Sequence, residues 1–469
     1  MTIFSFILIV TLLVIFFLNK SLKNIYKKLL ILTIILEINI GAGYFLKFGN
    51  TEFSFSEVVT GILLITSLFF LIRVPINKKI FLTISCLIAV IIIGVLFMIV
   101  IPYNGLIIDF SGSWDEYLYG VQDKVNVNFT IQPILFVIRI LIFIVLLLVN
   151  ESVFTKKDWN SVIKYVLYFS KLSIIWGVFE WITKNVFVTN IMNNISNKIF
   201  GIGESTYTNL ILRDDTYAIM GFSREPSGYA ITLAYIAILL IYNIKINQDK
   251  MFWLYINVAL LFLSMSLSSI VLGTMIIIIS ILVFEVKITK ANVLKKMLTL
   301  LVIIGLIIYI LNQNSSDNYY MLRLENSINE FQLILKGRYN TGIITSEKVR
   351  IISIVDTFKV FLDRPLFGLG IGTTSSHSSI ISILSNIGVI GFFYWVKTIK
   401  SIGQIISYNN LKFNITLIIF LIPFLVIGDF SLLYGLDIIP IILVIKIIYS
   451  QFNENVSYQI ILDRTSSFI

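Results

Sequence analysis

Long apolar runs, each close to the length of a membrane crossing, alternate with short polar stretches along almost the whole chain. A helix needs about 20 predominantly apolar residues to cross the hydrocarbon of a bilayer. Runs that approach this length lie at roughly 2–18, 29–46, 56–73, 80–101, 131–149, 162–182, 228–244, 251–267, 269–286, 297–312, 380–396, 413–428 and 434–450. The pattern predicts an all-α, polytopic integral membrane protein with about 12–13 transmembrane helices.

Composition leads to the same class of protein. Apolar residues make up 57% of the chain and charged residues 13%, whereas about a quarter of the residues in a typical soluble domain are charged. In water such a chain would expose too much apolar surface, so lipid must be the solvent for most of it. The single cysteine, Cys86, allows no intrachain disulfide.

The basic residues indicate a topology. They gather in alternate connections between the apolar runs, and the positive-inside rule places those connections in the cytoplasm. The clusters are Lys20, Lys23, Lys27 and Lys28; Arg73, Lys78 and Lys79; Lys156 and Lys157; Lys245 and Lys250; Lys287, Lys290, Lys295 and Lys296; and Lys397 and Lys400. The N-terminus is then outside and the C-terminus cytoplasmic. Because the net charge of +10 is divided among these clusters, it does not indicate a nucleic-acid partner.

The long connections fall on the external side, at about 102–130, 183–227 and 312–379. Loops of this length in compact proteins are usually functional or disordered. No internal repeat and no low-complexity linker divides the chain, so residues 1–469 are expected to form a single membrane domain. The first apolar run lacks a basic leader and a small-residue cleavage site, and it is expected to be a retained helix.

The third external loop is predicted to contain an amphipathic helix. From Arg350 onward, apolar side chains recur with a helical period at Ile351, Val355, Phe358 and Leu362. A helix of this kind can lie flat on the outer surface of a membrane. Pro365 is expected to end it, because a proline disfavours the helical conformation in the residue before it.

A glycine run at Gly368, Gly370 and Gly372 follows the predicted helix. It does not match a nucleotide-binding fingerprint, because the spacing is wrong and no strand precedes it. Two interpretations remain open. The run is a flexible re-entry into the next transmembrane helix, or its backbone amides bind a ligand anion.

Several of these segments together resemble bacterial O-antigen polymerases and O-antigen ligases. The matching stretches are Ser346-Glu-Lys-Val-Arg350, the amphipathic helix, Arg364-Pro-Leu-Phe-Gly-Leu-Gly370, His377 and Asn386-Ile-Gly-Val-Ile-Gly391. A further stretch, Gly221-Phe-Ser-Arg-Glu-Pro-Ser-Gly228, resembles a segment that precedes a membrane helix in many of the polymerases. The chain departs from the ligases at Ser378, where they commonly have asparagine. It also lacks the Arg-x10-Gly motifs described for some polymerases. The positions eleven residues after two of the loop arginines hold arginine (224) and valine (349) in place of glycine.

The resemblance implies an inverting glycosyl transfer between lipid-linked glycans at the outer face of the bacterial cytoplasmic membrane. The donor would be a growing glycan on undecaprenyl pyrophosphate, and the acceptor another lipid-linked repeat unit. The product would be an O-antigen or a capsule. No cofactor, metal or nucleic acid is required. The implied partners are these glycans, membrane lipids and a chain-length regulator protein. The alternative within the family is a ligase, which transfers the glycan to a final acceptor.

Five arginines are candidates to hold the pyrophosphate, because one guanidinium group can donate two parallel hydrogen bonds to phosphate oxygens. They are Arg213, Arg224, Arg338, Arg350 and Arg364, all in external loops. His377 or Glu225 could accept the proton of the attacking hydroxyl. Each has a simpler interpretation: His377 is a solvated polar residue, Arg350 is a membrane anchor, and Arg224 and Glu225 cap the helix that begins near Pro226.

Ionisable residues inside the predicted spans keep a transporter open as a second alternative. Because charges at membrane depth are costly, they tend to pair or to form relays. Glu37 or Glu180 could neutralise Arg139 or Lys171. A relay would suit a transporter, including a flippase for the same lipid-linked glycans. Against this interpretation, the chain shows no two-half symmetry of the kind common in transporters. A purely structural protein is least favoured, because it would leave the external arginines unexplained.

Overall fold

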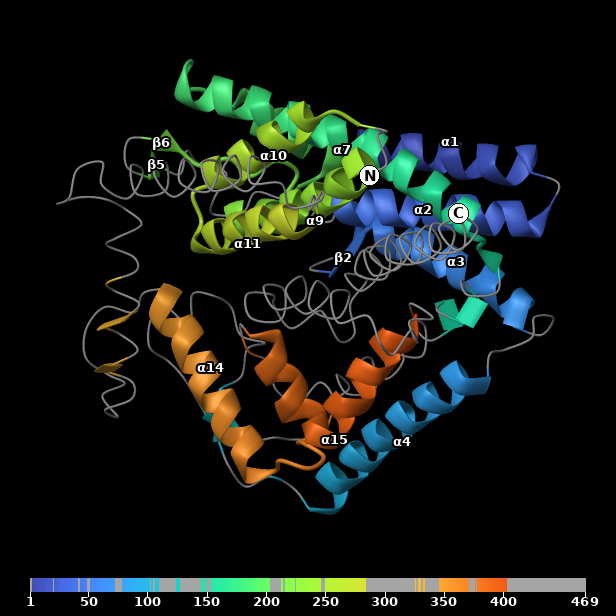
Figure 1. The fold of residues 1–469 in the computed structure, drawn as a ribbon, viewed down its shortest axis with the longest axis vertical. Coiled ribbons are helices and arrows are strands. Elements are labelled where there is room, and N and C mark those ends of the chain that lie inside the picture. Colours follow the sequence, from blue (N-terminus) through green and yellow to red (C-terminus); the bar gives the residue numbers. More distant parts are fainter. Residues whose placement is uncertain are drawn as a thin grey trace, which may run out of the picture.

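The structure is a computed structural model of the chain. It describes residues 2–19, 21–40, 43–48, 51–71, 78–101, 103, 106–108, 124–126, 145–146, 148–149, 153–202, 212–213, 216–223, 225–245, 249–283, 325, 328–329, 332–333, 346–370, 376 and 378–402. These residues are mostly helical (Figure 1). The predicted spans at 297–312, 413–428 and 434–450, and nearly all of 131–149, lie outside them.

Most of the remaining predicted spans coincide with helices. These are α1 (Ile3–Leu18), α3 (Phe55–Leu71), α4 (Lys78–Val100), α7 (Lys156–Asn185), α9 (Pro226–Lys245), α10 (Met251–Leu263), α11 (Leu267–Val283) and α15 (Ser379–Ile402). Four helical segments in the described residues are long and apolar enough to cross a membrane: Phe81–Val100, Asp158–Asn185, Pro226–Ile244 and Ser379–Thr398. A membrane location is therefore consistent with the fold.

The prediction of a span at 29–46 was wrong in its boundaries. Helix α2 runs from Leu22 to Ile40, and a hairpin of β1 (Tyr44–Phe48) and β2 (Thr51–Ser54) follows it. Other segments approach closely just after the helix, because a Cβ at Gly43 would lie 2.8 Å from the Phe55 ring and 3.0 Å from the Phe200 carbonyl oxygen. At the other end, the basic cluster joins the helix, and Lys27 pairs with Asp158 at 2.6 Å.

The connections predicted to be external contain more regular structure than the sequence indicated. Helix α8 (Ile191–Phe200) lies in the second loop and ends at Gly201, whose φ of 63° is left-handed. Two hairpins, β3 (Leu106–Ile108) with β4 (Lys124–Asn126) and β5 (Leu212–Arg213) with β6 (Thr216–Tyr217), depart from the purely α-helical prediction. Strand pairing gives the amides and carbonyls of these extended segments the hydrogen-bond partners that a helix would otherwise supply.

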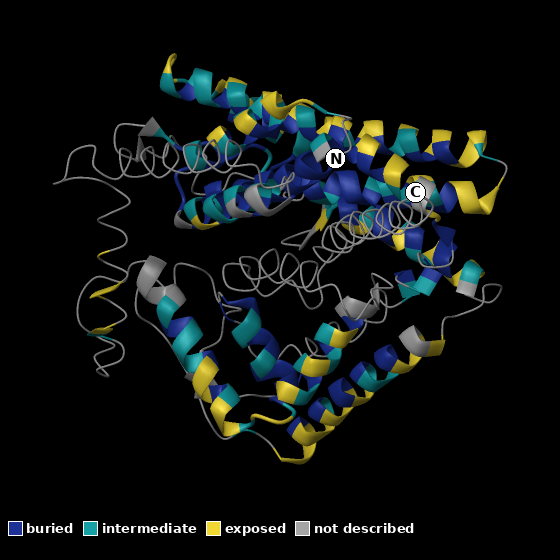
Figure 2. Ribbon diagram, viewed as in Figure 1, coloured by how far each residue is buried: buried dark blue, intermediate teal, exposed yellow. Residues whose placement is uncertain are grey.

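Large apolar side chains are found both in the core and on the exposed surface. Figure 2 shows how buried and exposed residues are distributed over the helices. One buried cluster joins α2, α7 and α9 to parts of α1, α3, α4, α10, α11 and α15. On the outside of α1, Phe6 is 67% and Phe17 83% exposed. A helix that is apolar on both sides is typical of a membrane span, because lipid replaces water as its solvent. Helix α14 (Ser346–Asp363) lies with α4 and α15 in the lower part of Figure 1.

Candidate functional site

The two segments that carry most of the resemblance are hydrogen-bonded to each other. Residues 364–370 connect α14 to the approach to α15, and residues 386–391 lie inside α15. Four backbone bonds join them: Leu369 N–H to Ser385 O at 2.8 Å, Gly370 N–H to Asn386 O at 3.0 Å, Val389 N–H to Pro365 O at 2.8 Å, and Ile390 N–H to Leu366 O at 3.3 Å. We call these two bonded segments the backbone clip.

The clip closes a break in α15. At Gly388 the helix is interrupted, with φ of 65° and ψ of −175°. In an unbroken helix the carbonyls of Ser385 and Asn386 would accept from the amides of Val389 and Ile390. In the clip, residues 365–370 accept from those two amides and donate to those two carbonyls. Each amide and each carbonyl freed by the break therefore has a new hydrogen-bond partner, which backbone groups require in a water-poor environment.

The glycines of both motifs follow from this geometry. Gly368 has a φ of 69°, and a Cβ there would lie 2.5 Å from the Ser385 carbonyl oxygen. Gly388 has a φ of 65°, and a Cβ there would collide with the backbone of Leu366 and Phe367. A residue with a side chain would be strained at either position.

This arrangement bears on the anion-binding interpretation of the glycine run. The amides of Leu369 and Gly370 donate to carbonyls of α15, so these two amides are not available to bind an anion. Gly372 lies outside the described residues.

The clip is attached to the end of α4. The Tyr103 hydroxyl donates to Asp363 Oδ2 at 2.6 Å, and Arg364 Nη2 donates to the carbonyl of Ile101 at 2.6 Å. The Phe97 and Phe367 rings stack with centroids 5.6 Å apart. Burial, followed by the bond to the Asp363 carboxylate and its charge, raises the pKa of Tyr103 to about 12. Arg364, a candidate for binding pyrophosphate, thus has a structural contact.

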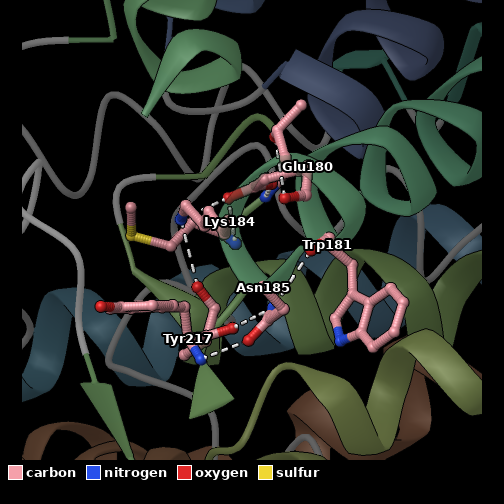
Figure 3. A network of polar contacts seen from close by, with 9 residues as sticks. Glu180, Trp181, Lys184, Asn185 and Tyr217 are labelled. Atoms are coloured by element: carbon pink, nitrogen blue, oxygen red, sulfur yellow. Dashed lines mark hydrogen bonds and ion pairs between the residues drawn. The ribbon is translucent and has the colours of Figure 1, made fainter. Parts of the chain in front are cut away.

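The second motif, Gly221–Gly228, is preceded by a segment that a buried ion pair holds in place (Figure 3). Glu180 and Lys184, one turn apart on α7, are 0% and 1% exposed, with Lys184 Nζ 2.7 Å from Glu180 Oε1. The Glu180 carboxylate also accepts from the amides of Met220 at 3.0 Å and Gly221 at 2.7 Å. Lys184 donates in turn to the carbonyl of Ala218 at 3.1 Å. We call this set the ion-pair anchor.

Neighbouring amide side chains extend the anchor. Asn193 of α8 bonds to both charges. Its side-chain nitrogen lies 3.1 Å from Glu180 Oε1, and its side-chain oxygen lies 3.2 Å from Lys184 Nζ. Asn185 bonds to the backbone of Tyr217 through both side-chain atoms, accepting at 2.7 Å and donating at 3.1 Å. Tyr217, Ala218, Met220 and Gly221 are therefore hydrogen-bonded to side chains of α7.

The partners proposed for the intramembrane charges were wrong for Glu180 and Lys171. Glu180 pairs with Lys184 on its own helix, and Lys171 pairs with Asp249 at 2.8 Å. The sequence contained a signal for the first pair, because a glutamate four residues before a lysine is a favourable helical arrangement. Lys184 was assigned to the external loop instead, since α7 was expected to end at about residue 182. Arg139 lies outside the described residues.

Glu225 immediately precedes α9, which begins at Pro226. Its carbonyl accepts the amide of Tyr229 at 3.2 Å, and its carboxylate accepts from the Ser227 hydroxyl at 3.1 Å. The backbone bond fits the interpretation of Glu225 as a capping residue. Glu225 is also partly exposed.

The other candidates are placed only in part. Arg213 lies in β5, opposite Thr216, and Arg350 lies in the first half of α14. Arg224, Arg338 and His377 lie outside the described residues. In the described part of the chain, no three His, Cys, Asp or Glu side chains gather into a group that could hold a metal ion.

The residues on either side of His377 are well anchored. Ser376 and Ser378 are buried, and the Ser376 amide donates to Ser382 Oγ at 2.8 Å. Ser378 accepts the amide of Ser382 at 2.9 Å, within the first turn of α15. Both flanks of this candidate base are thus attached to the start of the interrupted helix.

No protein-family model matches the chain, and no curated protein matches it. Functional inference therefore depends on the motifs and on the geometry of their described residues.

Proposed function

We propose that the chain is a membrane glycosyltransferase that polymerises undecaprenyl-pyrophosphate-linked oligosaccharide repeat units into a surface polysaccharide. The backbone clip is the observation that supports this most. Two stretches that resemble one family, separated by about 15 residues, are bonded to each other, and the bond geometry requires glycine at Gly368 and Gly388 within them. Motif residues that depend on one another structurally are less easily explained as separate chance matches.

The proposed reaction is a single inverting displacement. A hydroxyl oxygen of the acceptor glycan attacks the anomeric carbon of the donor, and the bond from that carbon to the pyrophosphate oxygen breaks. The leaving undecaprenyl pyrophosphate keeps the electron pair, and arginines neutralise its charge. The hydroxyl proton passes to His377 or Glu225. An unperturbed histidine, with a pKa near 6.5, is mostly neutral at pH ~7 and able to accept it.

Deletion of the gene, followed by gel analysis of the glycans, tests the class of activity. Loss of a polymerase leaves a single repeat unit on the final acceptor. Loss of a ligase strands long chains on the carrier lipid, and loss of a flippase traps single repeats on the carrier inside the cell. Either of the last two results would contradict the proposal.

Substitutions in the purified protein test the proposed roles of individual residues. If His377 is the base, His377→Ala should lower turnover by about 10²–10⁴-fold while donor binding is kept. Glu225→Gln is the matched variant for the rival base. For the pyrophosphate, Arg224→Lys and Arg350→Lys should recover only part of the activity lost in the alanine variants, because lysine keeps the charge but lacks the planar fork. Full activity of Arg350→Ala would leave that residue as a membrane anchor.

A further inference from the structure

Helix α14 exposes two large apolar side chains and buries two small polar ones. Phe358 is 43% and Leu362 59% exposed, whereas Ser353 is 0% and Thr357 5% exposed. A surface helix of a water-soluble domain has the opposite arrangement, with its apolar stripe toward the core. The burial pattern therefore indicates that the outer face of α14 meets a medium other than water.

The helical period places the exposed apolar residues on one face. Phe358 and Leu362 are four positions apart, and the half-buried Val355 is three positions before Phe358, so the three side chains lie on the same side of the helix. Ser353 and Val360, seven positions apart and buried, lie on the side that packs against the protein. Val360 belongs to a small core with Met98 and Leu369, which joins α14 to α4 and the clip.

This apolar face continues onto α4. The bonds of Asp363 to Tyr103 and of Arg364 to Ile101 fix the C-terminal end of α14 beside the end of α4. Leu366, between them, is 59% exposed. The same end of α4 exposes Leu96, Val100 and Ile101 at 53%, 75% and 53%. In Figure 2 the exposed parts of α4 and of the C-terminal end of α14 lie along the lower edge of the molecule.

We infer that α14 is seated in the bilayer interface at the end of α4, with Phe358, Leu362 and Leu366 among the acyl chains of that leaflet. The continuity with α4, one of the helices able to cross a membrane, identifies the occupant as bilayer lipid. Helix α14 is itself too charged to cross, because its 18 residues include Glu347, Lys348, Arg350, Asp356, Lys359 and Asp363. An apolar face on such a helix is suited to the interface.

The consequence is that the clip lies at a fixed depth, beside the membrane surface. This inference does not depend on the proposed glycosyl transfer, and it extends the sequence-based expectation of a surface helix by naming the residues that enter the lipid.

Spin labels on single cysteines test the inference. The protein carries Cys86→Ser as background, with one label at position 358, 362 or 366, and is reconstituted into phosphatidylcholine–phosphatidylglycerol vesicles. Lys359 is the matched control, because it lies on the same helix and its side chain is 55% exposed. Oxygen concentrates in hydrocarbon, whereas a neutral nickel chelate stays in water. The ratio of oxygen to nickel accessibility should be several-fold higher at 358, 362 and 366 than at 359.

Two results would overturn the inference. If the ratio of oxygen to nickel accessibility at 358 and 362 is as low as at 359, the apolar face lies in water. Low accessibility to both reagents, together with spin–spin broadening that disappears on dilution with unlabelled protein, would show that a second copy of the chain covers it. All the labelled positions are exposed, and the three apolar sites provide independent readings if one variant fails to fold.

Discussion

Two regions of the molecule, one before the Gly221–Gly228 motif and one at residues 364–370, are held in place by different means. Residues 217–221, which lead into the second motif, are held by side chains, chiefly the buried Glu180–Lys184 pair. Residues 364–370 are held by backbone bonds to the interrupted helix α15. A side-chain anchor fails when one charged residue is replaced. A backbone clip tolerates many side-chain changes, but it requires glycine where the chains approach closely. The sites at which each region is vulnerable are therefore different in kind.

The largest effect is expected at the ion-pair anchor. Removing one member of a buried pair leaves the other charge uncompensated, which typically costs about 3–5 kcal/mol. Glu180→Ala and Lys184→Met should each lower the free energy of unfolding, measured in mixed micelles, by roughly this amount. Glu180→Ala should have the larger effect, because it also removes the acceptor of the Met220 and Gly221 amides. The double variant should lose less than the sum of the two.

The Lys171–Asp249 pair is the matched control for this comparison. The Lys171 side chain is 26% exposed, so water compensates part of the charge left on Lys171 when Asp249 is replaced. Asp249→Ala should therefore have a clearly smaller effect than Glu180→Ala. If the two are equal, burial of the pair is not what makes the anchor matter.

A smaller loss is expected when the clip is forced open at Gly388. Alanine there must adopt a left-handed conformation and press against the backbone of residues 366 and 367, which together cost about 2–4 kcal/mol. Gly61→Ala is the control, because no atom lies within 4 Å of a Cβ at that helical glycine. It should be neutral or stabilising by up to about 1 kcal/mol. Equal thermal stability of the two variants would mean that α15 is not interrupted at Gly388.

The smallest effect is expected where the clip meets α4. Tyr103→Phe removes the bond to Asp363 at a partly exposed position and should cost about 1 kcal/mol. The bond also has a pH signature. Because folding raises the pKa of Tyr103 from 10 to about 12, its contribution to stability is complete below pH 10 and is lost as the pH rises to about 12. The difference in stability between wild type and Tyr103→Phe should shrink across that window. A constant difference would remove the hydrogen bond as its cause.

Sequence patterns were reliable where one helix could be considered alone. The apolar runs predicted α1, α3, α4, α9 and α11 closely, and Pro365 was correctly expected to end α14, which stops at Asp363. Among the site residues, the adjacency of Glu225 and Pro226 was enough to predict the start of α9. Local rules of length, polarity and proline geometry determine these features, and all of them can be read within a window of about 20 residues.

Features that depend on contacts between distant segments could not be predicted in this way. The sequence showed the glycines at 368, 370 and 388 but not that they face one another, because an interrupted helix has no signature until the segment that replaces its bonds is known. Likewise, Glu180 and Lys184 were visible as charges, but their common role of holding residues 218–221 depends on the fold.

The membrane-length apolar runs, most of the helices and the glycine-bearing motifs of this protein were determined by its sequence alone, because hydrophobic length and backbone permissiveness are properties of local residues. The tertiary structure decided which charges pair, which amides the glycine run uses and which face of α14 is exposed. Each of these depends on how segments far apart in the chain pack against one another, because polar groups buried by that packing must find partners.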